Sequence, residues 1–321
     1  MDRERSARRH LRTLALLLVA TPALAASAPL PLAALRWTEP TLALDALTSG
    51  PPECLAAIAD PAERTRIELG RAGFRTPLLL GGQAARLGLS CDSCHVNGRG
   101  NPAFRFPGLS GAPGTADVTA PLMSTHRGDE SFDPRPIPDL ARPGKISRAP
   151  GDPALRRFIR GLIVEEFDGR EPPPAVLDGL ASYVRALDSK ACPLRRDVPA
   201  SAESTADGAL RAVAAARERL GAGDRAAARL MLGAARGALG RLAERYVGLT
   251  ESRRRLIAAD AQLRSVLTRL DRPGADRAMQ SWLDRAKAWR TVIARDEPRS
   301  LFAREALARA LTSATARRST R

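Results

Sequence analysis

Two thiols and an imidazole stand within five consecutive residues of this chain, Cys91-Asp92-Ser93-Cys94-His95. Two cysteines at this spacing can each bond one vinyl group of the same porphyrin, and the histidine that follows can bind the porphyrin's iron. Cys-x-x-Cys-His is the attachment sequence of a c-type haem. We therefore predict one covalent haem c, bound through Cys91 and Cys94, with His95 as an axial ligand of its iron.

The N-terminus of the chain fits a protein whose haem is attached outside the bacterial cytoplasm. The first twelve residues are rich in arginine, residues 13–25 are apolar, and Ala23-Leu24-Ala25 offers a small-x-small cleavage site. This is the layout of a secretory signal peptide. We predict a signal peptide over 1–25 and a periplasmic location. The alternative is an uncleaved anchor, but the apolar run is shorter than the roughly 20 residues that cross a bilayer.

The composition predicts an all-α protein. Of the 321 residues, 44% are hydrophobic and 4% are aromatic, and alanine, leucine and arginine predominate. These three residue types favour helix. No segment alternates β-branched and polar residues between turn signals, which is the pattern of strands. The length suits two domains.

Charge divides the chain into two parts. Residues 26–200 hold 21 basic and 20 acidic side chains, whereas residues 201–321 hold 25 basic and 13 acidic ones. The second part also has helical spacing of its apolar residues and contains neither histidine nor cysteine. We predict four regions after the signal peptide: an N-terminal extension over 26–60, a haem domain over 61–198, a linker over 199–207, and a basic antiparallel helical bundle over 208–321.

Two cysteines remain outside the haem motif, Cys54 and Cys192. Spare cysteines usually pair in an oxidising compartment, so we predict a disulfide between them. Two free thiols or a bond to another chain are the alternatives. The predicted bridge would enclose the haem domain and stabilise it by roughly 4–5 kcal/mol in the chain-entropy model.

Around the haem motif, over roughly residues 62–190, the chain resembles the class I cytochrome c family. Residues 95–100 are close to the family's Cys-His-x-x-Gly-x-Gly, and residues 107–111 match its Pro-x-Leu-x-Gly. The resemblance implies a cytochrome c-like haem domain. It also implies that the carbonyl of Pro107 accepts a hydrogen bond from the outer ring nitrogen of His95 and so orients that ligand.

Two predicted helices belong to the same resemblance. Residues 79–88 form a short helix before the motif, where the family has its N-terminal helix. Residues 174–188 place apolar side chains on one helical face and look like the family's C-terminal helix, which crosses the N-terminal one. Between them, residues 101–150 contain nine prolines. We expect irregular chain there, wrapped around the haem edge.

A second axial ligand for the iron has two candidates. Met123 and His126 are the only methionine and the only other histidine inside the predicted haem domain. Methionine is the usual ligand of the resembling family and raises the reduction potential, whereas a second histidine lowers it. Met123 is our first candidate and His126 the alternative. If neither binds, the iron keeps an open face.

These features predict an exported cytochrome that transfers single electrons through one haem. Residues 75–82 and 136–140 also resemble parts of the di-haem cytochrome c peroxidase family, but those enzymes carry two haem motifs and this chain carries one. A peroxidase-like enzyme with an open iron, or a haem-based sensor or interaction subunit, is the alternative. No catalytic residue stands out.

The charge of the basic C-terminal part indicates which kinds of partner the protein could bind. Positive charge favours an acidic surface, so we expect a redox partner protein that has one. Peripheral contact with an anionic membrane is also consistent with the charge. We expect no nucleic acid partner, because aromatic residues are not interleaved with the basic ones.

Overall fold

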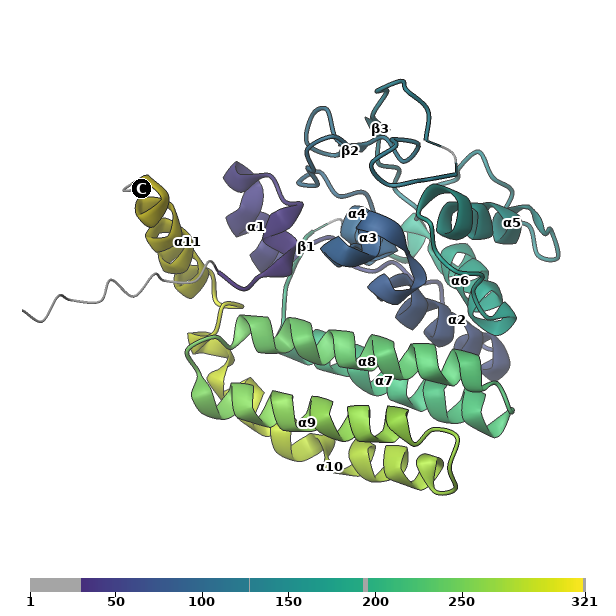
Figure 1. The fold of residues 1–321 in the computed structure, drawn as a ribbon, viewed down its shortest axis with the longest axis vertical. Coiled ribbons are helices and arrows are strands. Elements are labelled where there is room, and N and C mark those ends of the chain that lie inside the picture. Colours follow the sequence, from purple (N-terminus) through teal and green to yellow (C-terminus); the bar gives the residue numbers. More distant parts are fainter. Residues whose placement is uncertain (1–29, 127, 193–195, 320–321) are drawn as a thin grey trace, which may run out of the picture.

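The computed structural model describes residues 30–126, 128–192 and 196–319 (Figure 1). The predicted signal peptide lies outside the described residues. The described chain is mostly helical, as the composition predicts, and its only strands are two pairs of two residues each. No helix among the described residues combines the length and the apolar character needed to cross a membrane.

Among its described residues, the N-terminal part contains six α-helices and a long irregular segment (Figure 1). The helices are α1 (Ala43–Thr48), α2 (Pro61–Phe74), α3 (Gly82–Leu87), α4 (Cys91–Cys94), α5 (Ala154–Gly161) and α6 (Pro174–Ala186). The strands pair as β1 (Ser49–Gly50) with β4 (Val198–Pro199), and β2 (Thr115–Ala116) with β3 (Arg135–Pro136). Among the described residues of the proline-rich stretch 101–150 there is no helix, and β2 and β3 are its only paired strands, as expected.

Helices α2 and α6 cross at two glycines. A Cβ atom built on Gly70 would lie 1.9 Å from the carbonyl oxygen of Gly179, so the two backbones touch directly. Asp60 caps the start of α2 by accepting from the amides of Ala62 and Glu63. The helix that crosses α6 is thus α2, and the predicted pairing of α6 with residues 79–88 is wrong. That stretch contains only the short α3, because glycines flank it on both sides.

The C-terminal part is the predicted helical bundle. Its long helices are α7 (Ala202–Gly221), α8 (Arg225–Arg245), α9 (Thr250–Thr268) and α10 (Ala275–Asp296). The pair α7 and α8 lies against the N-terminal part, and α9 and α10 form the far layer (Figure 1). Buried alanines line the α7–α8 contact and let these two helices approach closely. Trp282 and Trp289 are buried, as their spacing of seven predicts.

The predicted linker over 199–207 is wrong for most of its length. Helix α7 begins at Ala202, where the hydroxyl of Ser201 accepts from the amide of Ser204. Just before it, β4 pairs with β1. Serine and alanine suit a capped helix start as well as a loop, which is why composition alone placed the helix start too late.

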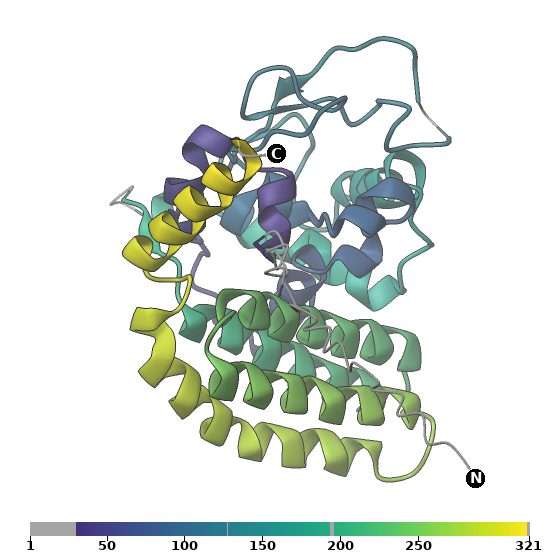
Figure 2. The same cartoon turned by 60° about the vertical axis from the view of Figure 1, so that its left-hand side comes forward.

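The predicted extension packs against the end of the chain. Helix α11 (Arg304–Ser319) leaves the bundle and lies beside α1 (Figure 2). Leu32 and Leu47 form a separate small core with Leu301 and Leu307. Most of the other buried apolar side chains of the described residues form one continuous cluster that runs through both parts. The chain therefore has a shared core where the sequence suggested two domains.

The predicted disulfide is confirmed. Cys54 and Cys192 are bonded, and they are separated by 138 residues along the chain. Close by, Leu55 forms a β-bridge with Leu187. The disulfide therefore ties the segment before α2 to the segment after α6.

Candidate functional site

The two motif cysteines share one short helical turn. In α4 the amide of Ser90 donates to the hydroxyl of Ser93, which holds the turn together at its start. Cys91 and Cys94 are half-buried, and neither forms a disulfide. Positions three apart lie on the same side of a helix. The two thiols can therefore react with one planar group.

The motif thiols are kept neutral. Burial raises the pKa of both Cys91 and Cys94 to about 12. Reactive dithiols and thiolate metal sites instead depend on a lowered thiol pKa. The raised pKa values of Cys91 and Cys94 therefore argue against a pair of reactive thiolates at this turn.

His95 follows α4 directly and contacts helix α2. Its ring centroid is 6.4 Å from that of Phe74, which in turn packs on Tyr183 of α6. Nδ1 of His95 lies 3.0 Å from the carbonyl oxygen of Pro138. A carbonyl can only accept, so Nδ1 carries the proton and Nε2 keeps its lone pair free. Burial lowers the pKa of His95 to about 4, which keeps the ring neutral and able to bind a metal ion.

Pro107 does not have the role that the resemblance implied. It is exposed, and the hydrogen-bond acceptor of His95 is Pro138, 43 residues along the chain. Within the matched stretch 107–111, Leu109 and Ser110 are the buried residues. Sequence reasoning singled out residues 136–140 only as a resemblance to the di-haem peroxidases. It did not connect them with His95, because nothing in the local pattern shows where an irregular loop returns.

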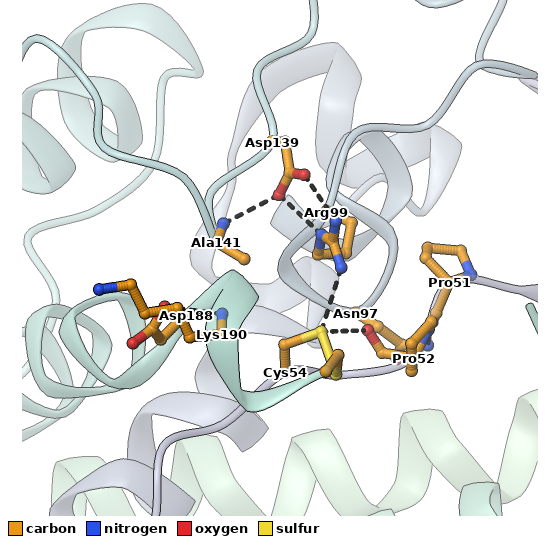
Figure 3. The surroundings of a disulfide bond; sticks show 10 residues. Pro51, Pro52, Cys54, Asn97, Arg99, Asp139, Ala141, Asp188 and Lys190 are labelled. Atoms are coloured by element: carbon orange, nitrogen blue, oxygen red, sulfur yellow. Dashed lines mark hydrogen bonds and ion pairs between the residues drawn. A yellow bond between two sulfur atoms is a disulfide. The ribbon is translucent and has the colours of Figure 1, made fainter. Parts of the chain in front are cut away.

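A bidentate ion pair holds the chain next to Pro138. Arg99 donates to both carboxylate oxygens of Asp139 at 2.7 Å, and Asp139 also accepts from the amide of Ala141 (Figure 3). Burial raises the pKa of Asp139, but the hydrogen bonds from Arg99 and Ala141 outweigh it, and the pKa lies below its usual value. Arg99 also donates to the sulfur of Cys54, so this cluster reaches the disulfide.

The residues just after His95 form a tight turn. Asn97 and Gly98 both have positive φ, 53° and 73°. The side chain of Asp92 accepts from the amide of Asn97, and the Asn97 side chain donates to the carbonyl of Pro51. A Cβ atom on Gly98 would lie 2.4 Å from a methyl group of Leu187. The family-like glycine is therefore needed for both conformation and space.

A buried carboxylate supports this turn from behind. Glu53 accepts from Arg71, from Arg75 at 2.8 Å and from the hydroxyl of Tyr183 at 2.7 Å. Arg75 also donates to Asn97. Burial by itself would raise the pKa of Glu53, but the positive charges of Arg75 and Arg71 lower it by more. The net pKa lies below its usual value, so the carboxylate stays ionised. Sequence reasoning missed this network, whose members are scattered over more than a hundred residues.

The two candidates for the second axial position have opposite environments. Met123 is 1% exposed and belongs to the same apolar cluster against which Cys91 and Cys94 pack. The side chain of His126 is 62% exposed, and its Nδ1 lies 3.0 Å from Asp168. A methionine side chain in this core is surrounded by apolar groups, whereas His126 already has a polar partner at the surface.

A large cavity lies between the N-terminal part and the bundle. Its volume is about 790 Å³, and Asp92 and Ser93 of α4 line it, but Cys91, Cys94 and His95 do not. No group of three or more His, Cys, Asp or Glu side chains in the described ranges could hold a metal ion. Haem iron needs only one or two protein ligands, so it does not depend on such a group.

Comparison with protein families, curated proteins and solved structures finds no match to this chain.

Proposed function

We propose that this protein is an exported c-type cytochrome that transfers single electrons through one haem c bound to Cys91, Cys94 and His95. The observation that carries the proposal is the combination at α4: two unpaired, neutral thiols on one turn, followed by a histidine whose Nδ1 is already hydrogen-bonded. Nε2 of His95 is left as the metal-binding atom.

The two thiols and the imidazole present at this turn have the chemistry that a covalent haem needs. Cys91 and Cys94 would hold it by thioether bonds and His95 would bind its iron, which supplies a one-electron couple when bound. Phe74 limits how the His95 ring can turn, and Pro138 fixes its tautomer. Cys91 and Cys94 are half-buried and pack against the apolar core, which would cover part of a group bound to them.

For the second axial position we propose Met123. Its burial in the apolar core supports this choice, since a thioether needs no polar partner there. His126 would have to give up its hydrogen bond to Asp168 and move inward from the surface. An iron without either ligand would favour a peroxidase-like or gas-sensing protein instead.

The decisive experiment tests whether the protein is exported and whether haem is covalently attached to it. The full chain is produced in a bacterium with a c-type haem maturation system, and the periplasmic protein is examined by mass spectrometry and by pyridine haemochrome spectroscopy. We expect loss of the N-terminal 25 or so residues and one covalently bound haem. The variant Cys91→Ala/Cys94→Ala should carry no covalent haem. Wild-type protein without covalent haem would overturn the proposal.

We further propose that the basic bundle docks an acidic redox partner. The charge excess of residues 201–321, 25 basic against 13 acidic side chains, supports this. Attraction of this kind is screened by salt. Electron transfer to an acidic partner should therefore slow as ionic strength rises, and rates that do not depend on salt would contradict it.

A further inference from the structure

The carbonyl of Pro138 cannot be positioned by its own residue. Proline has no backbone N–H, so hydrogen bonds must come from its neighbours on either side. On one side, the amide of Ile137 donates to the carbonyl of Gly114 at 2.9 Å. On the other side, the carbonyl of Pro138 shares its peptide plane with the nitrogen of Asp139. Fixing Asp139 therefore fixes the direction of the group that accepts from His95.

Asp139 is fixed by a pair of charge-assisted hydrogen bonds. Arg99 contributes Nε and Nη2 to the two carboxylate oxygens at 2.7 Å each, and the side chains are only 11% and 21% exposed. A bidentate arginine–carboxylate pair restrains both distance and orientation. A third contact, from the amide of Ala141 at 2.9 Å, stops the carboxylate from rotating.

These contacts close a ring that begins and ends at the histidine. Arg99 is four residues after His95, and its amide donates to the carbonyl of Val96 at 2.9 Å. From Arg99 the ring continues through Asp139 to the carbonyl of Pro138 and back to Nδ1 of His95. Arg99 also contacts the sulfur of Cys54 at 3.0 Å, which attaches the ring to the disulfide (Figure 3).

We propose that Arg99 and Asp139 are positioning residues that hold the Pro138 carbonyl on His95 and so set how strongly His95 donates to the iron. This inference rests on the proposed function. A firmly held acceptor on Nδ1 makes the imidazole a better donor and favours ferric over ferrous iron. Loosening that acceptor should raise the midpoint potential.

The variant Arg99→Lys tests this without changing charge. Lysine is a point charge and cannot reproduce the two-point contact with Asp139. We expect the midpoint potential of the exported, haem-loaded protein to rise by about 59 mV, which corresponds to a tenfold change in the ferric-to-ferrous ratio for a one-electron couple. Arg142→Lys is the matched control, because Arg142 reaches the same carboxylate from the surface at 3.5 Å. The control should leave the potential unchanged.

A second variant separates positioning from electrostatics. Arg99→Gln removes a positive charge, which by charge alone would lower the potential, whereas loss of positioning raises it. A rise in both Arg99→Lys and Arg99→Gln supports the inference. An unchanged or lowered potential in Arg99→Lys overturns it. Far-UV circular dichroism and the mass of the intact disulfide confirm that each variant folds, and Asp139→Asn serves as an isosteric replacement if a change at Arg99 prevents folding.

Failure of the proposed function can be told apart from failure of this inference. If the wild-type protein carries no haem, the proposed function fails, and the positioning is then read from the ¹⁵N NMR signals of the His95 ring in the same full chain. We expect a single Nδ1-protonated tautomer in the wild type and a mixture in Arg99→Lys. Identical ring signals in the two proteins would contradict the positioning role. If haem is bound but the potential does not shift, only this inference fails.

Discussion

At the scale of residues, two sets of polar contacts organise the surroundings of the Cys-x-x-Cys-His motif. The carbonyl of Pro138 orients His95. Behind the turn that follows His95, Glu53 accepts hydrogen bonds from Arg71, Arg75 and Tyr183. Buried polar groups that keep all their partners specify one conformation, and those that lose a partner are costly. The residue-level tests below therefore remove one partner at a time.

Replacing Glu53 with glutamine should destabilise the protein. The variant leaves Arg71 and Arg75 facing a neutral group in a region where the Glu53 side chain is only 10% exposed. Breaking a buried ion pair costs about 3 kcal/mol or somewhat more. Urea unfolding of the variant Glu63→Gln is the control, since Glu63 of α2 pairs at the surface with the half-exposed Arg66. The control should lose less than about 1 kcal/mol.

The same carboxylate predicts a dependence of stability on pH. Burial raises the pKa of Glu53, but Arg75 and Arg71 lower it to a net value below that of the unfolded chain, which is about 4.3. The stability it contributes is present above the unfolded pKa and is lost as the pH falls through the folded pKa. Urea unfolding between about pH 6 and pH 3 should show this loss in the wild type and less of it in Glu53→Gln. Equal slopes in both proteins would contradict the prediction.

The axial ligand is tested by volume-conserving replacement. Met123→Leu keeps the core filled and should cost less than about 1.5 kcal/mol. It should convert a low-spin haem spectrum into a high-spin one that binds carbon monoxide readily. His126→Asn, at the surface, should leave the spectrum as it is. The opposite pattern would assign His126, and no change in either variant would show that neither side chain binds.

At the scale of elements, the close crossing of α2 and α6 positions the haem motif. Phe74 at the end of α2 contacts His95, and Tyr183 of α6 contacts both Phe74 and Glu53. Direct backbone contact at Gly70 and Gly179 sets how near these helices come. The amphipathic pattern of α6 is visible in the sequence, but its partner helix is not, since a pair of glycines leaves no apolar signal.

The variant Gly70→Ala should separate α2 from α6. Its Cβ atom would lie 1.9 Å from the Gly179 carbonyl oxygen, so the helices must move apart. Overpacking of this kind costs about 1–3 kcal/mol. Gly208→Ala, inside α7 with nothing within 4 Å of the new Cβ, is the control and should stabilise the protein by about 0.4–1 kcal/mol. Thermal unfolding should rank the three proteins in the order Gly208→Ala, wild type, Gly70→Ala.

At the scale of the whole molecule, the N-terminal part and the bundle fold as one packed unit. One apolar cluster runs through both, and Arg211 of α7 pairs with Glu68 of α2 at 3.2 Å across the junction. The extension before α2 packs on α11 near the end of the chain. The disulfide then joins the segment before α2 to the segment after α6. Unfolding by urea is expected to be cooperative across both parts.

Removing the disulfide should weaken the whole molecule. The variant Cys54→Ala/Cys192→Ala opens a loop of 138 residues. In the chain-entropy model, opening a loop of this size lowers the free energy of unfolding by roughly 4–5 kcal/mol. Wild-type protein under reducing conditions should show a similar loss. The double variant should not respond to the reductant, and a response there would place the effect elsewhere in the chain.

The sequence by itself determined the features that depend on neighbouring residues. The haem prediction rests on five adjacent residues, the helical class on composition, the bundle and α6 on apolar periodicity, and the confirmed disulfide on counting the cysteines that the motif leaves over. Tertiary structure alone decided that Pro138 and not Pro107 accepts from His95, that α2 crosses α6, and that α7 begins at Ala202. Periodicity and spacing are local, whereas the path of an irregular, proline-rich loop depends on ion pairs such as Arg99–Asp139 that form only when distant segments meet.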